Sequence, residues 1–205
     1  MKALKLVVLV CAFALMVRPL WASSFSPCGS VPGNLVVNCG FETGDFTGWA
    51  LGGGSLSIYG YTYVVSGAQN GYSGANSGNY YAVMGPEYTD GTLSQTLSTS
   101  VGTDYTFAFY LASLGDSPSD FSAYWDGTQL LSLTNPNSSG AYILYTYSVT
   151  GTGSDTIQFD FQDDPNYLAL DDISVSAVPE PGAFSLLFLG LGISFVGRQH
   201  LLARS

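Results

Sequence analysis

Short runs of Tyr, Phe, Val, Ile and Thr recur through the middle of the chain, and clusters of Gly, Asn, Asp, Ser and Pro separate them. Runs of this kind are typical of β-strands joined by turns. The alternation is clearest where Ile157, Phe159 and Phe161 fall on one face of an extended segment and polar residues fall on the other. The pattern therefore predicts strands at 34–38, 55–66, 79–84, 93–99, 105–112, 121–125, 129–134, 142–149, 156–162 and 168–176.

These strands predict one all-β domain at 34–177, in which two sheets pack face to face. One face of each sheet would lie inward, and the other would meet water. Asp126 and Gly127 form a tight-turn signal between two of the strands, which favours a hairpin. No repeat of fixed period is present, which disfavours a propeller or a solenoid.

The first residues have the layout of a secretory signal peptide. Lys2 and Lys5 precede an apolar stretch at 6–17, and small residues follow at Ala22 and Ser23. We therefore expect export through the general route, with a signal peptide at 1–22 and a linker at 23–33.

The last residues have three parts: a strip at 178–181, an apolar run at 182–197, and a tail at 198–205 that carries Arg198 and Arg204. Two prolines keep the strip extended, so the active-site cleft of a processing enzyme could bind it. The apolar run is at or below the roughly 17 to 25 residues of a stable span, so we expect a hydrophobic helix held only briefly in a membrane. Basic residues after the run place the C-terminus in the cytoplasm and the body of the protein outside.

The strip reads Val178-Pro179-Glu180-Pro181, and together with the short span and the terminal arginines it resembles the PEP-CTERM sorting signal of Gram-negative bacteria. The resemblance implies recognition by an exosortase, a membrane-embedded cysteine transpeptidase, with cleavage near the motif. It also implies transient anchoring in the inner membrane, followed by delivery to the outer surface, the cell envelope or an extracellular matrix of exopolysaccharide. A simple C-terminal anchor that keeps the protein in the envelope is the alternative.

The charges are divided unevenly between the ends and the body. All five Lys and Arg residues and the single His fall in the terminal segments, whereas 14 of the 15 acidic residues lie between Ser23 and Val178. An acidic body repels phosphates and anionic membrane surfaces, so we expect no nucleic-acid partner. The field attracts divalent cations, although solubility alone explains most of these acids.

The same composition argues against catalysis. Without Lys, Arg or His the body cannot assemble Ser/His/Asp or Cys/His machinery or a histidine-ligated zinc site. The acid pairs Asp163/Asp164 and Asp171/Asp172 could suggest a glycosidase, but adjacent strand residues point apart. We therefore expect no enzymatic activity.

Cys28 and Cys39 are the two cysteines that export would retain. An oxidising compartment permits a disulfide between them, which would pin the N-terminal segment onto the domain. Two unrelated buried thiols are the alternative.

The ends of the body resemble galactose-binding-like jelly rolls. Residues 34–44 read Asn-Leu-Val-Val-Asn-Cys-Gly-Phe-Glu-Thr-Gly and precede Trp49, and residues 164–175 read Asp-Pro-Asn-Tyr-Leu-Ala-Leu-Asp-Asp-Ile-Ser-Val. These segments look like the opening and the closing strand of that fold, with Cys39 as a departure from the usual small residue. The resemblance implies a jelly-roll β-sandwich, which hosts many functions.

In jelly rolls of this kind an acid near each end commonly helps to hold a structural calcium ion, which implies Glu42 and Asp171 here. Asp172 is the weaker candidate, because strand alternation sends it to the opposite face. The alternative is that Glu42 accepts backbone hydrogen bonds and that the two aspartates are polar residues at a strand end.

Two non-enzymatic functions remain open. One is a carbohydrate-binding surface protein that contacts exopolysaccharide or another glycan, with Trp49 and Trp125 as candidate flat faces for sugar rings. The other is a structural component of a matrix or biofilm that has no discrete ligand.

Overall fold

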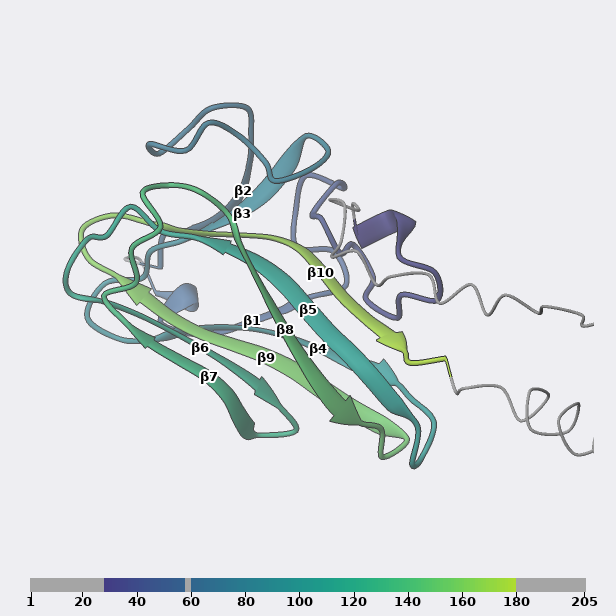
Figure 1. Cartoon of the computed structure of the whole chain (residues 1–205). Helices are drawn as coiled ribbons and strands as arrows, with labels where there is room; N and C mark the ends of the chain where they lie inside the picture. The colour runs from purple at the N-terminus through teal and green to yellow at the C-terminus, as the bar shows by residue number, and fades with distance from the viewer. Residues whose placement is uncertain (1–27, 58–59, 180–205) are drawn as a thin grey trace, which may run out of the picture.

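The computed structural model describes residues 28–57 and 60–179, which form a sandwich of two five-stranded sheets (Figure 1). The first sheet has the order β1-β4-β9-β6-β7, and the second has the order β2-β3-β10-β5-β8. Every strand pair is antiparallel. The strands of the first sheet are β1 (Ala50–Gly53), β4 (Gly91–Ser98), β9 (Ser154–Asp163), β6 (Ser119–Trp125) and β7 (Thr128–Thr134). Those of the second are β2 (Thr62–Ser66), β3 (Tyr80–Met84), β10 (Leu168–Ala177), β5 (Asp104–Ala112) and β8 (Ile143–Thr150), and two short 3₁₀ helices, η1 (Cys28–Ser30) and η2 (Gly54–Leu56), complete the elements.

The prediction of an all-β, two-sheet sandwich is therefore confirmed. The expected strand at 34–38 is wrong: residues 34–36 have no regular secondary structure and residues 37 and 38 lie in a turn. The side chain of Asn34 bonds to β10 where a paired strand would. Its side-chain oxygen accepts hydrogen bonds from the N–H groups of Val36 and Val175, at 3.1 and 2.9 Å. The expected strand at 55–66 shortens to β2, and β1 was missed because its Ala-Leu-Gly-Gly sequence has no β-branched or aromatic residue.

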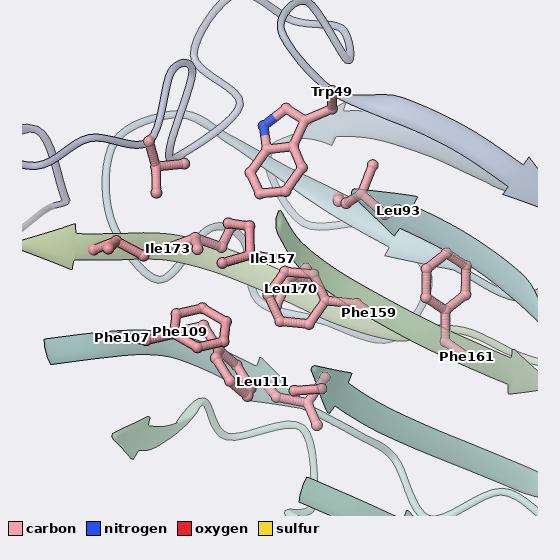
Figure 2. Packing of buried hydrophobic residues seen from close by; sticks show 14 of the residues in the cluster. Trp49, Leu93, Phe107, Phe109, Leu111, Ile157, Phe159, Phe161, Leu170 and Ile173 are labelled. Atoms are coloured by element: carbon pink, nitrogen blue, oxygen red, sulfur yellow. The ribbon is translucent and has the colours of Figure 1, made fainter. Parts of the chain in front are cut away.

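Aromatic rings fill the space between the sheets (Figure 2). Phe159 lies at the centre, fully buried, with its ring centroid 5.0 Å from that of Phe109 and 5.6 Å from that of Phe121. The alternation along β9 places Ile157, Phe159 and Phe161 inward, as predicted. A second apolar cluster lies on the outer face of the second sheet, where the loop 67–79 covers it: Val65, Tyr72, Tyr81, Val83, Ala112 and Ala169.

No helix within residues 28–57 and 60–179 has the length and apolar character needed to cross a membrane. The predicted signal peptide at 1–22, the apolar run at 182–197 and the tail with Arg198 and Arg204 lie outside the described residues.

We predict that Phe159→Ala lowers the free energy of unfolding by about 3 to 5 kcal/mol, because the cavity cannot collapse among four neighbouring aromatic rings. Urea unfolding followed by tryptophan fluorescence measures the change. Val101→Ala is the control, since Val101 is 80% exposed and its loss should shift stability by less than about 0.5 kcal/mol. Equal effects of the two substitutions would contradict this packing.

Candidate functional site

A β-bulge in β10 brings two adjacent carboxylates to the same loop. The register of β10 against β5 shifts between Asp171 and Ser174, and Asp172 has a φ of 50°. Asp171 Oδ2 accepts hydrogen bonds from the N–H groups of Asn76 and Ser77, at 2.8 and 3.2 Å. Asp172 accepts from Asn76 Nδ2 at 2.7 Å, Ser77 Oγ at 2.8 Å and Cys28 N at 2.9 Å. The expectation that alternation would send Asp172 away from Asp171 is wrong, because the bulge interrupts the alternation.

The Cys28–Cys39 disulfide closes the loop that lies beside these acids, with the two Cα atoms 5.9 Å apart. Cys39 O accepts a hydrogen bond from Ile173 N, so the bridge ties η1 to β10 through both its ends. Burial, followed by the negative charge of Asp172, raises the pKa of Asp171 to about 8. A hollow of about 360 Å³ opens here and is lined by Cys28, Gly29, Asn38, Cys39, Gly40, Glu42, Ser77, Gly78 and Asp172.

Glu42 and Asp171 both accept backbone hydrogen bonds, and the calcium site that the resemblance implies for them stays a prediction. Glu42 Oε1 accepts hydrogen bonds from Asn79 N and Tyr80 N, at 2.9 and 3.0 Å. Both oxygens of Asp171 accept hydrogen bonds from backbone N–H groups, Oδ2 from Asn76 and Ser77 in the same loop and Oδ1 from Asp172. In the described part of the chain, no three Asp, Glu, His or Cys side chains form a cluster suited to a metal ion. The acids at this position stabilise loops through hydrogen bonds.

Trp49 and Trp125 belong to the core, which corrects their assignment as glycan contacts. They are 9% and 6% exposed, and their rings pack against Phe159 and Phe107 respectively. Trp125 does not stand at a sheet edge, because β6 lies between β9 and β7 and its alternation turns the ring inward. Neither ring presents a face to a sugar.

One end of the sandwich gathers the loops 85–90, 113–118 and 164–167, which we call the loop end. The registers Leu168↔Met84, Ala169↔Ala112 and Ser119↔Asp163 place the ends of the flanking strands together. Two hydrogen bonds join the loops, from Asp164 N to Pro118 O at 3.1 Å and from Asn166 Nδ2 to Asp116 Oδ2 at 2.8 Å. The loops 113–118 and 164–167 are therefore held together by hydrogen bonds.

Tyr167 of the loop 164–167, Tyr61 just before β2 and Tyr63 on β2 form a tyrosine patch beside the loop end. Tyr61 and Tyr63 are 42% and 38% exposed, and the rings of Tyr63 and Tyr167 meet edge to face at 5.6 Å. Burial, followed by the adjoining Tyr63 hydroxyl, raises the pKa of Tyr167 to about 12, so its hydroxyl is neutral at physiological pH. Gly85 permits this packing, since a Cβ there would stand 2.8 Å from the Tyr167 ring.

Asp163 lies at the loop end but points inward. It follows Ile157, Phe159 and Phe161 on the core face of β9 and is fully buried. Within the described chain, neither of its carboxylate oxygens has a hydrogen-bond partner. Burial, followed by the charges of Asp116, Asp164 and Asp120, raises the pKa of Asp163 to about 7. The sequence carried this signal, because the alternation that identifies the core face of β9 continues to position 163.

The outward-facing side of the first sheet is a second candidate surface, which we call the polar face. Gln158 Nε2 donates to Asp160 Oδ1 at 2.7 Å, and Gln129 Nε2 donates to Ser122 Oγ at 3.1 Å. Burial, followed by the charge of Asp90, raises the pKa of Asp120. The other outward-facing positions of the central strands are Thr92, Ser94, Thr96, Tyr124, Thr156 and Gln162.

The predicted sorting motif begins immediately after the last strand. Val178 N donates to Asp104 O at 2.9 Å, so the first motif residue is still held by the sandwich. Pro179 follows on the surface, and Glu180 and Pro181 lie outside the described residues.

No protein-family model matches the chain, and no curated protein matches it. Among solved structures, the chain is similar to the carbohydrate-binding module TmCBM61 in complex with β-1,4-galactotriose, at 19% identity and a TM-score of 0.55, over 71% of this chain and 99% of that module. It is also similar to a cleaved adhesin domain of Lys-gingipain from Porphyromonas gingivalis, at 20% identity and a TM-score of 0.52, over 68% and 96% of the two chains. The xylan-binding domain CBM22-1 from Paenibacillus barcinonensis Xyn10C matches at 14% identity and a TM-score of 0.50, over 71% and 96%. At these identities the similarity shows a shared β-sandwich fold.

We predict that Asp172→Ala lowers the free energy of unfolding by about 2 to 4 kcal/mol, because three donors lose a charged acceptor. Asp104→Ala is the matched control: that carboxylate is exposed and accepts from the Thr150 hydroxyl, so its loss should cost less than about 1 kcal/mol. Chemical denaturation measures both. If Asp172→Ala were as stable as the control, the bulge would not hold the loop.

Proposed function

We propose that this protein is a non-catalytic, extracellular glycan-binding module and that the tyrosine patch is its binding surface. The observation that carries the proposal is the exposure of Tyr61 and Tyr63 beside the loop end, next to a third tyrosine ring. Aromatic rings pack against the C–H faces of sugars, while nearby amides and carboxylates bind hydroxyl groups. The fold shared with carbohydrate-binding modules supports this class of function.

The surroundings of the tyrosine patch suit a neutral glycan. Asn70 Nδ2 donates to the Tyr63 hydroxyl at 3.3 Å, and the negative charge of Glu87 contributes to the raised pKa of Tyr167. No basic side chain occurs between residues 28 and 179, so an acidic polysaccharide would be repelled. We therefore propose a neutral exopolysaccharide or other neutral glycan as the ligand.

A sorting route accounts for how such a module reaches its ligand. We propose export by the N-terminal signal, transient anchoring in the inner membrane of a Gram-negative bacterium, and exosortase processing at Val178-Pro179-Glu180-Pro181. The position of this motif directly after β10 supports the proposal, because cleavage there would leave every strand intact. The cell envelope, outer surface or extracellular matrix would then be the site of action.

The binding proposal predicts that Tyr61→Ala and Tyr63→Ala each weaken glycan binding by about tenfold, the loss expected for one aromatic contact. A glycan array identifies the ligand, and pull-down with that polysaccharide gives relative affinities. Tyr124→Ala is the control, because Tyr124 is the tyrosine of the polar face and should leave binding unchanged.

Loss of binding in Tyr124→Ala, with Tyr61→Ala and Tyr63→Ala unaffected, would move the site to the polar face. Absence of binding to any glycan, together with altered biofilm cohesion on deletion, would favour a structural matrix component without a discrete ligand. Either result would overturn the tyrosine patch as the binding surface.

The sorting proposal predicts that the mature protein isolated from its host ends near Pro181. Mass spectrometry of the C-terminal peptide measures this end, and an added mass would show covalent attachment. A Pro179→Ala, Pro181→Ala double variant should retain the tail. A mature wild-type chain that still ends at Ser205 would contradict processing and favour a simple anchor.

A further inference from the structure

The carboxylate of Asp163 is buried without any neutralising group. The residue has no exposed surface, and both its oxygens lack a hydrogen-bond partner in the described chain. Its neighbours along the core face of β9 are Ile157, Phe159 and Phe161, all fully buried. An ionised carboxylate in such surroundings is strongly destabilising unless a partner compensates it.

The donors around Asp163 are used elsewhere. Ser119, its partner in the β6–β9 register, donates its hydroxyl to Asp116 O at 2.7 Å and its N–H to Asn135 Oδ1 at 3.0 Å. Asn166 Nδ2 donates to Asp116, and Asp164 N donates to Pro118 O. These four donor groups are therefore engaged with acceptors other than Asp163.

The other acidic side chains at the loop end add negative charge near Asp163. The negative charges of Asp116 and Asp164 act on Asp163, and they reach it from the two loops that flank the end of β9. No Lys, Arg or His occurs between residues 28 and 179 to offset them. Carboxylate and carbonyl oxygens are the ligands that Ca²⁺ prefers.

We propose that Asp163 and Asp116 bind a Ca²⁺ ion at the loop end. Two carboxylates do not fill a calcium shell, so backbone carbonyl groups of the loops 113–118 and 164–167 and water complete it. Asp163 differs from the acids at the β10 bulge because neither of its oxygens has a hydrogen-bond partner in the described chain, whereas Asp171 and Asp172 accept several hydrogen bonds. Asp116 accepts one, from Asn166 Nδ2 to its Oδ2. The ion would order the loop that carries Tyr167, independently of whether the tyrosine patch binds a glycan.

Thermal unfolding of the purified protein with excess EGTA and with millimolar Ca²⁺ tests this site, and isothermal titration calorimetry gives the stoichiometry. We expect one Ca²⁺ per chain and a rise in Tm of about 5 °C or more at saturation. Terbium, which tyrosine sensitises, is a second probe, because Tyr72 lies near both acids. Its luminescence should appear on binding and be lost on addition of Ca²⁺.

Asp163→Asn keeps the size of the side chain and removes its charge, so it should fold and lose both the calcium heat and the Tm response. Asp116→Asn should weaken calcium binding at least about tenfold. Asp172→Asn is the control for the other acid site and should retain a normal response to calcium.

A calcium response retained in Asp163→Asn would overturn the site. So would a wild-type protein that is insensitive to calcium and becomes more stable at pH 8 on Asp163→Asn, because a proton alone would then neutralise the carboxylate. Glycan binding that fails while calcium binding persists would count against the tyrosine patch and leave the ion site standing.

Discussion

The sandwich buries carboxylates and has no basic side chain between residues 28 and 179 with which to pair them. Each buried acid must therefore find hydrogen-bond donors, a proton or an ion from solution. Asp155 shows the first solution. Burial acts to raise its pKa, but hydrogen bonds from the side chains of Thr99 and Asp126 and from Thr152 outweigh burial and lower the pKa to about 2. Asp172 is satisfied in the same way by groups from two loops. The loops that close the sandwich are thus organised around its acids.

The sequence predicted the layers well because alternation is a local property. The inward face of β9 could be read directly from Ile157, Phe159 and Phe161, and the structure agrees. Features set by distant partners were not predictable in this way. β1 is held by pairing with β4 despite a weak strand sequence, and Asp172 is redirected by a bulge that no local pattern reveals. Trp49 and Trp125 look like binding residues in the sequence, but both side chains are buried in the core, Trp49 from the turn before β1 and Trp125 from the inward face of β6.

The polar face and the loop end are the two candidate ligand-binding surfaces, and their side chains differ in chemistry. The polar face offers hydroxyl, amide and carboxylate groups held by contacts such as that between Gln158 and Asp160. Beside the loop end lies what the polar face largely lacks, which is a group of aromatic rings with solvent access at Tyr61 and Tyr63. Sugar recognition relies on both kinds of contact, so the loop end is the better match.

The path of β10 has a mechanical consequence. This strand is hydrogen-bonded on both sides, to β3 and to β5, and the chain leaves it directly toward the C-terminal segment. Leu35 N and Cys39 O also bond to β10, so the N-terminal loop is fastened to the same strand. A pulling force applied through the C-terminus would therefore load the centre of a sheet, where several ladder bonds must shear together. A domain tethered by this end would resist extension before any edge strand could peel away.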